Sequence, residues 1–207
     1  MEQLGPDGLF QKLPRSENWD LDLNKTGGIE AKAIFNYRHS LCRQAIWEIK
    51  FRGNQKLILD FSTLLYEFIL EEISELQTFK NYSEIILLPI PSSSKRRRER
   101  GFNQCELIVN ELIKEDKRRN QNNFTANNKL LIKNTYTNKQ SRTHGRSARL
   151  NNVINTMQTN NRFITGDKKT LYILIDDVIT TGATMAEAVR VLKQAGVKNT
   201  IGFALAH

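Results

Sequence analysis

The residues best suited to chemistry lie close together between positions 171 and 184, where the sequence reads LYILIDDVITTGAT. An apolar stretch ends in two adjacent acids, Asp176 and Asp177, and a turn with three threonines and Gly182 follows them. Adjacent carboxylates can accept hydrogen bonds from the two hydroxyls of a ribose, as an acid does in dinucleotide sites. A hydroxyl-rich turn that opens into a helix offers N–H and O–H donors to a phosphate. The combination predicts a site for ribose 5-phosphate.

Each part of this segment has a predicted role. Asp176 and Asp177 hold the ribose hydroxyls, and the 5-phosphate is bound by Val178, Ile179, Thr180, Thr181, Gly182, Ala183 and Thr184. The alternative is an ordinary strand–helix turn in which one Asp or Thr caps the helix. That alternative explains one acid and one threonine but not the whole group. Neither a Gly-x4-Gly-Lys-Ser/Thr phosphate loop nor a Gly-x-Gly-x-x-Gly dinucleotide motif occurs in the chain.

A second candidate is the basic segment at residues 92–101, which we expect to be a loop between a strand and a helix. Its cations are Lys95, Arg96, Arg97, Arg98 and Arg100. Such a loop can neutralise a pyrophosphate leaving group through backbone amides and charged side chains. Two alternatives stay open, namely a solvated charge run and contacts with nucleic-acid phosphates.

Residues 134–149 are polar and basic, and their place between predicted strands favours a flexible flap that closes over a ligand. The candidate residues of this flap are Gln140, Arg142, Arg146 and Arg149. A basic loop without that role is a nearly equal alternative. His144 receives no catalytic role, because a lone histidine in a loop is usually just exposed.

The composition fits a cytoplasmic protein with anionic partners. Lys and Arg number 31 against 22 Asp and Glu, and the formal net charge of +9 favours phosphates, nucleic acid or an acidic protein surface without choosing among them. Cys42 and Cys105 lie far apart, so we expect no disulfide framework, no structural zinc and no other metal held by the protein alone. Cys105 is predicted to pack rather than to act as a nucleophile. Without a secretory signal or a membrane-length apolar run, no membrane insertion is expected.

The elements that must position these residues alternate between strands and helices. Apolar runs predict strands at residues 33–37, 85–89, 130–132, 171–176 and 200–205. Helical spacing predicts helices at residues 41–50, 57–76, 102–114 and 183–195. Ser40 is expected to cap the first helix and Gly53 to end it, while residues 115–128 form an exposed connection. Apolar strands separated by helices are typical of an α/β fold whose mostly parallel sheet is covered on both faces.

Several stretches resemble known families. Residues 173–184 resemble the signature with which type I phosphoribosyltransferases bind 5-phosphoribosyl-1-pyrophosphate (PRPP). The stretch LPIPSSSKRRRERGFNQ at residues 88–104 is similar to the Pro-x-Pro…Arg-Gly-Phe-Asn-Gln segment of the ComF family. Further stretches similar to that family are AIFNY (33–37) with IWEIKFRG (46–53), and Gln140 with RLNNV (149–153). Together these matches extend over about residues 31–207.

The resemblance implies a type I phosphoribosyltransferase-like fold, PRPP as ligand, and Mg²⁺ bound chiefly through the pyrophosphate of PRPP. It further implies a pentosyltransferase that moves the phosphoribosyl group to a nitrogenous acceptor and serves competence and DNA uptake. The alternative is a non-catalytic component of the competence machinery that binds PRPP, single-stranded DNA or a helicase. Members of the family commonly begin with a four-cysteine zinc ribbon, and those cysteines are missing here.

The chain divides into a short leader and one domain. We expect residues 1–28 to be loose and residues 29–207 to form the phosphoribosyltransferase-like domain. Within it, residues 29–80 are the candidate hood, the element that covers the acceptor in such enzymes. Trp47 and Phe51 are predicted to belong to the core rather than to stack on bases.

Overall fold

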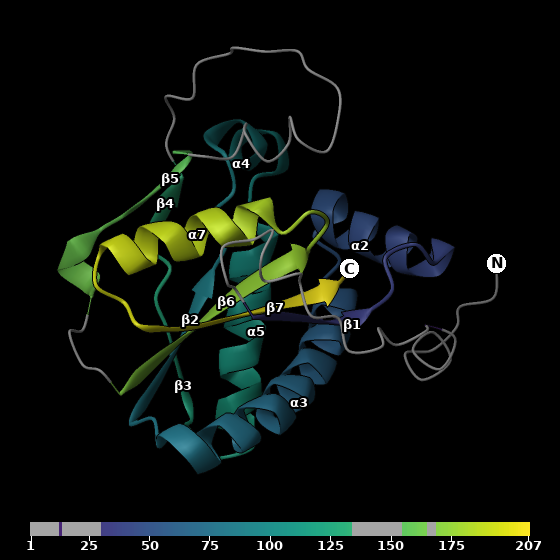
Figure 1. The fold of residues 1–207 in the computed structure, drawn as a ribbon. Helices are drawn as coiled ribbons and strands as arrows, with labels where there is room; N and C mark the ends of the chain where they lie inside the picture. The colour runs from purple at the N-terminus through teal and green to yellow at the C-terminus, as the bar shows by residue number, and fades with distance from the viewer. Residues whose placement is uncertain (1–12, 14–29, 134–154, 165–168) are drawn as a thin grey trace.

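The sheet at the centre of the fold consists of five parallel strands in the order β1-β7-β6-β2-β3. They are β1 (Ala31–Phe35), β2 (Glu84–Pro89), β3 (Phe124–Ala126), β6 (Thr170–Val178) and β7 (Asn199–Ala206). The computed structural model describes residues 13, 30–133, 155–164 and 169–207, and Figure 1 draws the others in grey. The predicted α/β fold with a mostly parallel sheet is confirmed.

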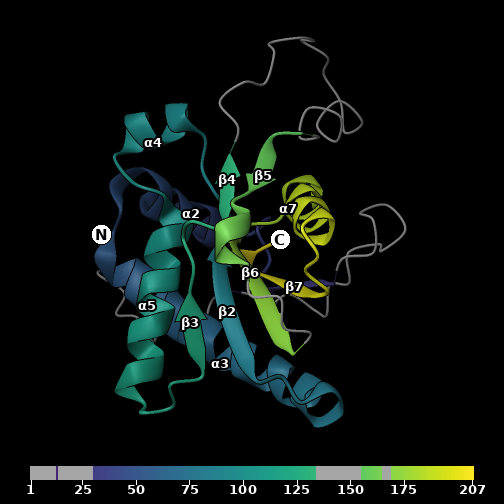
Figure 2. The ribbon, with the colours of Figure 1, turned by 90° about the vertical axis from the view of Figure 1, so that its left-hand side faces the viewer.

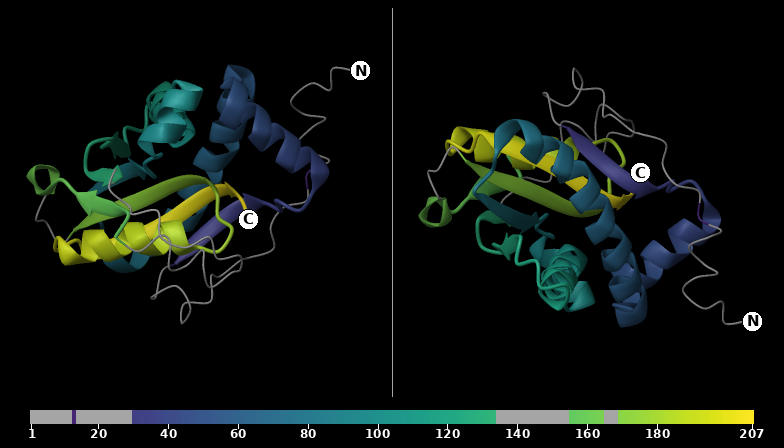
Figure 3. Two further views of the ribbon diagram at one scale, coloured as in Figure 1. Left: turned by 90° about the horizontal axis from the view of Figure 1, so that it is seen from above. Right: turned by 90° about the horizontal axis from the view of Figure 1, so that it is seen from below.

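Helices cover both faces of this sheet. They are α2 (Ser40–Arg52), α3 (Gln55–Lys80), α5 (Gln104–Arg118) and α7 (Ala183–Gln194). α7 lies on one face, and α3 and α5 lie on the other, together with α2 (Figure 2 and Figure 3). Alternate residues of β6 serve two cores, because Ile173 and Ile175 pack on the α3 side while Tyr172 and Leu174 pack on the α7 side. Burial on both faces explains why the strands are uninterrupted apolar runs.

The ends of α2 follow from two local features. Gly53 adopts a left-handed conformation with φ of 58°, and its N–H donates to the Glu48 carbonyl, which ends the helix as predicted. The residue before the helix is His39, whose side chain makes no capping hydrogen bond. Ser40 is therefore the first helical residue, and its predicted role as the cap was wrong.

The aromatic side chains of α2 contradict the prediction that they belong to the core. Trp47 is 46% exposed and Phe51 is 52% exposed. The buried positions of the helix are Cys42, Ala45, Ile46 and Ile49. These four residues occupy the face of α2 that packs on the protein, so Trp47 and Phe51, one turn apart, lie together on the other side. Their ring centroids are 5.4 Å apart.

Residues 92–101 were predicted to be a loop, and they contain a short helix instead. The helix α4 (Ser94–Arg100) has Ser93 as its N-cap, whose hydroxyl accepts a backbone hydrogen bond from the first turn. It ends at Gly101, where φ of 80° is again left-handed. A run of cations favours a solvated loop, but the serine cap and the terminal glycine stabilise a helical turn between them.

Residues 115–128 were predicted to be an exposed connection, but the end of α5 and the strand β3 (Phe124–Ala126) lie within them. α5 continues to Arg118, and β3 follows soon after it. Asp116 is only 1% exposed and accepts hydrogen bonds from the Tyr66 hydroxyl at 2.9 Å and the Phe124 N–H at 3.0 Å. The polar composition of the segment gave no sign that one of its acids would join α3, α5 and β3.

The predicted strand at residues 130–132 exists but does not join the main sheet. β4 (Leu131–Lys133) pairs antiparallel with β5 (Met157–Thr159) in a separate two-stranded sheet, and the short helix η1 (Asn161–Phe163) follows. The predicted leader, except Leu13, and the flap candidates Gln140, Arg142, Arg146 and Arg149 lie outside the described residues. The leader and the flap therefore stay predictions, and the hood, although residues 30–80 are described, stays one as well.

No helix in the described part of the chain combines the length and the apolar character that crossing a membrane requires.

Candidate functional site

Both acids lie at the end of β6, at the carboxyl edge of the parallel sheet. The turn after them is fastened to the sheet, since the Ile179 N–H donates to the Ala206 carbonyl of β7 at 2.9 Å. Gly182 precedes α7 with φ of 73°, a left-handed conformation that glycine adopts without strain. The strand, turn and helix thus follow one another as predicted. The acids Asp176 and Asp177 occupy the edge at which α/β proteins bind ligands.

A cavity of about 280 Å³ lies beside these acids. Its walls come from the end of β6, the following turn and the start of α7, and from the segment after β1, α2, the loop after β2, α4, the start of α5 and the end of β4. Of the residues predicted to bind a ligand, those that line it are Asp176, Asp177, Val178, Thr180, Thr184, Arg96 and Arg100. One cavity therefore brings together candidates from the basic segment and from the segment that follows β6.

The other candidates among the described residues do not line the cavity. They are Lys95, Arg97, Arg98, Ile179, Thr181, Gly182 and Ala183. Ile179 is 2% exposed and packs in the core on the α7 side. On α4, Arg96 and Arg100 are one turn apart and share a face, whereas Arg97 is paired with Glu106 at 3.0 Å. The basic segment offers the cavity two cations rather than five, because a helix presents one face at a time.

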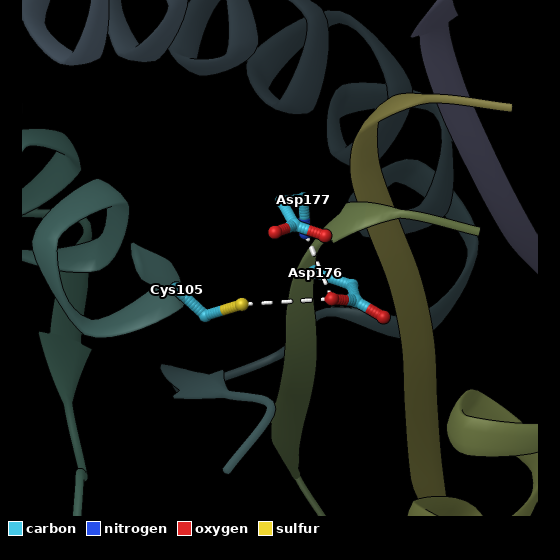
Figure 4. A group of neighbouring side chains, drawn as sticks. All are labelled: Cys105, Asp176 and Asp177. Atoms are coloured by element: carbon cyan, nitrogen blue, oxygen red, sulfur yellow. Dashed lines mark hydrogen bonds between the residues drawn. The ribbon is translucent and has the colours of Figure 1, made fainter. Parts of the chain in front are cut away.

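The two acids are buried and are held by different partners. Oδ1 of Asp176 accepts hydrogen bonds from the Asp177 N–H at 2.8 Å and from the Cys105 thiol at 3.5 Å (Figure 4). Oδ2 of Asp176 accepts no hydrogen bond from the described residues. The two oxygens of Asp177 are both engaged, by Lys50 at 3.1 Å and by the Gln104 amide at 2.7 Å. Asp176 thus keeps an acceptor for a ligand, while Asp177 is already occupied.

Burial changes the proton affinity of three groups around the cavity. Burial, together with the negative charge of Asp177, raises the pKa of Asp176 from 3.8 to about 7. Burial and the charges of both acids raise the pKa of Cys105 well above its ordinary value, so the thiol stays protonated and donates. Burial and the neighbouring Arg96 lower the pKa of Lys133. Near neutral pH, the acid pair therefore carries less than two full negative charges, which favours the approach of an anion.

Three competence proteins are 30% identical in sequence to this chain. Competence protein ComFC of Streptococcus pneumoniae matches over 178 residues, which is 86% of this chain and 68% of that protein. The chain belongs to the ComF family. ComFC of Bacillus subtilis matches over 169 residues, which is 80% of this chain and 58% of that protein. Competence protein F of Haemophilus influenzae matches over 112 residues, which is 54% of this chain and 45% of that protein.

Membership of the ComF family confirms the resemblance seen in the sequence. No protein-family model matches the chain. A solved structure of the allosteric regulatory enzyme of purine biosynthesis overlaps 61% of this chain and 23% of its own, with a TM-score of 0.34 and 16% identity. A likeness of that size supports no statement about function. The matched segments span 45% to 68% of the lengths of these ComF relatives.

Several residues of the cavity in this ComF chain were missed from the sequence: Tyr37, Lys50, Ile90, Pro91, Ser92, Asn103, Gln104, Cys105 and Lys133. Asn103 and Gln104 lie within a stretch that resembles the family, so a signal for them existed. Asn103 caps α5 and its amide also donates to the Ile90 carbonyl at 3.1 Å, which ties the loop after β2 to the helix. Lys50 lies in the stretch IWEIKFRG, which also resembles the family, but its contact with Asp177 could not be foreseen because that partner lies on another element.

The acid pair fits a magnesium ion only in part. Ligand atoms of Asp176, Asp177 and Cys105 lie within 4.8 Å of one another. Carboxylate oxygens suit Mg²⁺, whereas a protonated thiol is not a metal ligand. Two carboxylates cannot complete six-fold coordination, so the other ligands have to come from water or from a bound molecule. The donor set agrees with a Mg²⁺ that arrives with a phosphate-bearing ligand.

Proposed function

We propose that this ComF-family protein binds PRPP in the cavity beside β6 and uses it as a phosphoribosyl donor. The observation that carries the proposal is one cavity in which Asp176 and Asp177 lie among cations from separate elements. These cations are Lys50, Arg96, Arg100 and Lys133. Acids suit sugar hydroxyls and cations suit phosphates, and a phosphorylated sugar satisfies both groups at once.

Each part of PRPP has a place in this proposal. The ribose hydroxyls donate to the unoccupied oxygen of Asp176. The 5-phosphate binds at the turn that carries Thr180 and Thr184, next to the first N–H groups of α7. The pyrophosphate lies toward Arg96 and Arg100 on α4. Mg²⁺ would arrive bound to the pyrophosphate, and it would lower the charge of the leaving group.

The proposed reaction needs no nucleophile from the protein. A nitrogen atom of the acceptor forms a bond to ribose C1, and the C1–oxygen bond breaks with its electron pair leaving on pyrophosphate. Positive charge develops on the ribose as that bond breaks, and the negative charge that remains on the acid pair favours it. The contribution of the cavity is to fix the donor and to neutralise the departing pyrophosphate. The protonated Cys105 takes no part in bond formation.

Calorimetric titration with PRPP and Mg²⁺ tests the binding proposal. We expect the wild-type protein to bind PRPP and the double variant Asp176→Asn/Asp177→Asn to bind it at least about 10-fold more weakly, because neutral amides do not match the donors of a carboxylate site. Asp60→Asn alters an acid of α3 outside the cavity and should bind like the wild type. A folded wild-type protein that fails to bind millimolar PRPP would refute the proposal. Release of pyrophosphate on addition of nitrogenous acceptors tests transfer separately.

A second candidate function, binding of single-stranded nucleic acid, is favoured by the aromatic patch that Trp47, Phe51, Arg52 and Arg100 form on α2 and α4. The guanidinium of Arg52 lies 5.2 Å from the Trp47 ring centre, and that of Arg100 lies 4.7 Å from the Phe51 ring centre. Exposed rings accept unpaired bases by stacking, and the adjacent guanidinium groups bind phosphates. We propose this patch, which meets the cavity at Arg100, as the place where a strand would bind.

Fluorescence anisotropy with a short labelled oligonucleotide separates the two functions. If the patch binds a strand, Trp47→Ala/Phe51→Ala weakens binding about 10-fold or more, and affinity falls steeply as salt rises. Trp47→Ala alone should leave PRPP affinity within about threefold of the wild type, because Trp47 does not line the cavity and its guanidinium partner is Arg52 rather than the cavity residue Arg100. Equal oligonucleotide affinities of the double variant and the wild type would exclude the patch as the binding surface.

A further inference from the structure

Lys50 enters the cavity from α2, on the side of the sheet that α3 and α5 cover. Its ammonium lies 3.1 Å from Oδ1 of Asp177, and its side chain is 21% exposed. The proposed 5-phosphate turn leads into α7, which lies on the opposite face of the sheet (Figure 3). Lys50 and the turn therefore approach the acid pair from different sides, so we expect an anion bound by Lys50 to be a different group from the 5-phosphate.

Asp177 fixes this ammonium in place. One of its oxygens pairs with Lys50, and the other accepts the Gln104 amide at 2.7 Å, so the carboxylate cannot rotate without breaking a charge-assisted hydrogen bond. An ammonium has three N–H donors, and the pair with Asp177 uses one of them. Within the described residues, Lys50 makes no other ion pair or hydrogen bond. Its other donors are thus available to a ligand.

The contacts of Lys50 continue into the wall made by α4. Arg100 donates to the Gln104 side-chain oxygen at 3.1 Å, so Lys50 and Arg100 are joined through Asp177 and Gln104. The Ser92 hydroxyl, in the loop before α4, lines the same cavity and is buried without a partner in the described part of the chain. Two cations and a spare hydroxyl on one wall match a group with several anionic oxygens.

We propose that Lys50 is the residue that selects for pyrophosphate on ribose C1, with Asp177 holding its ammonium and its remaining donors binding pyrophosphate oxygens beside Arg100. This inference rests on the proposed function and refines it. Asp177 then serves mainly to orient Lys50, and the ribose hydroxyls depend on Asp176. A ligand without pyrophosphate gains little from Lys50, so the residue sets the preference for PRPP over ribose 5-phosphate.

The test compares two ligands on one variant. PRPP and ribose 5-phosphate are titrated separately, with Mg²⁺, into the wild type and into Lys50→Met. We expect Lys50→Met to weaken PRPP binding about 10- to 100-fold, the range for loss of a hydrogen bond to a charged group, and ribose 5-phosphate binding less than about threefold. The matched control Lys56→Met removes an exposed lysine of α3 that pairs with Asp60, and it should leave both affinities unchanged.

The outcomes separate this inference from the proposed function. If the wild type binds neither ligand, the proposed function fails and the role of Lys50 fails with it. If the wild type binds PRPP but Lys50→Met weakens both ligands equally, or neither, only the role of Lys50 is refuted. Should Lys50→Met not fold, Lys50→Gln, which retains a donor for Asp177, is titrated in the same way. A loss of PRPP preference in Lys50→Gln supports the inference, and an unchanged preference overturns it.

Discussion

Asp176 makes the stability of the protein depend on pH in an unusual direction. Most carboxyl groups of folded proteins are stabilised in the ionised form, so their ionisation strengthens the fold as pH rises. Asp176 is 9% exposed, and burial together with the charge of Asp177 raises its pKa to about 7. In the folded protein it therefore keeps its proton up to about neutral pH, whereas in the unfolded chain it loses the proton near pH 4.

The magnitude follows from the two pKa values. Between about pH 4 and pH 7, the folded state binds one more proton at this position than the unfolded state, so the free energy of unfolding falls as pH rises. The pKa rises from 3.8 to about 7, and at about 1.4 kcal/mol per pH unit the ionised Asp176 costs the fold about 4 kcal/mol. Asp176→Asn removes this cost and retains an oxygen that accepts the Asp177 N–H.

Urea unfolding of the wild type and of Asp176→Asn at a series of pH values measures the effect. The free energy of unfolding of the variant, relative to the wild type, should rise by about 4 kcal/mol between pH 4 and pH 7 and then stay constant. Using the difference removes the contribution of titrating groups that do not interact with Asp176. Carbon-13 NMR of the Asp176 carboxyl provides an independent titration, with a midpoint expected near pH 7. A difference that does not change with pH, or a midpoint near 4, would refute the reasoning.

Three further substitutions test the fold by urea unfolding. Tyr66→Phe leaves the buried Asp116 without its hydroxyl donor and should cost about 1–2 kcal/mol; a loss below about 0.3 kcal/mol would mean that this bond contributes little. Gly202→Ala places a methyl group 2.9 Å from the Met185 sulfur and should cost about 1–3 kcal/mol, and an unchanged midpoint would contradict that crowding. Asn103→Ala removes the cap of α5 and should lower the free energy of unfolding by about 2 kcal/mol and weaken PRPP binding. Unchanged PRPP binding would mean that the cap is not needed to form the cavity.

Features set by near neighbours in the chain could be predicted. The apolar run of β6, the acids at its end and the turn into α7 depend on residues within a few positions of one another, and the strand and helix form where expected. The end of α2 could be predicted for the same reason, because it requires only that Gly53 adopt the left-handed conformation. Strands that are apolar throughout already imply two covered faces, so the layered α/β architecture also followed.

Features that depend on which elements meet could not be predicted. The exposure of Trp47 and Phe51 depends on which face of α2 packs against the protein, and periodicity did not distinguish that face from its neighbour. The contribution of Arg96 and Arg100, without the other cations of the same run, required that α4 be a helix with one face toward the cavity. The sequence alone did not show which of these cations would face the cavity.

The sequence by itself determined the α/β class, the family resemblance and the acid pair beside a hydroxyl-rich turn. Only the tertiary structure decided that Lys50 of α2 pairs with Asp177, that Cys105 donates to Asp176, and that the two acids therefore have different surroundings. The physical reason is the distance along the chain between the residues that interact. Backbone conformation and capping are fixed by contacts within a few residues, whereas a cavity and its charges arise where side chains from separate elements come within hydrogen-bonding distance.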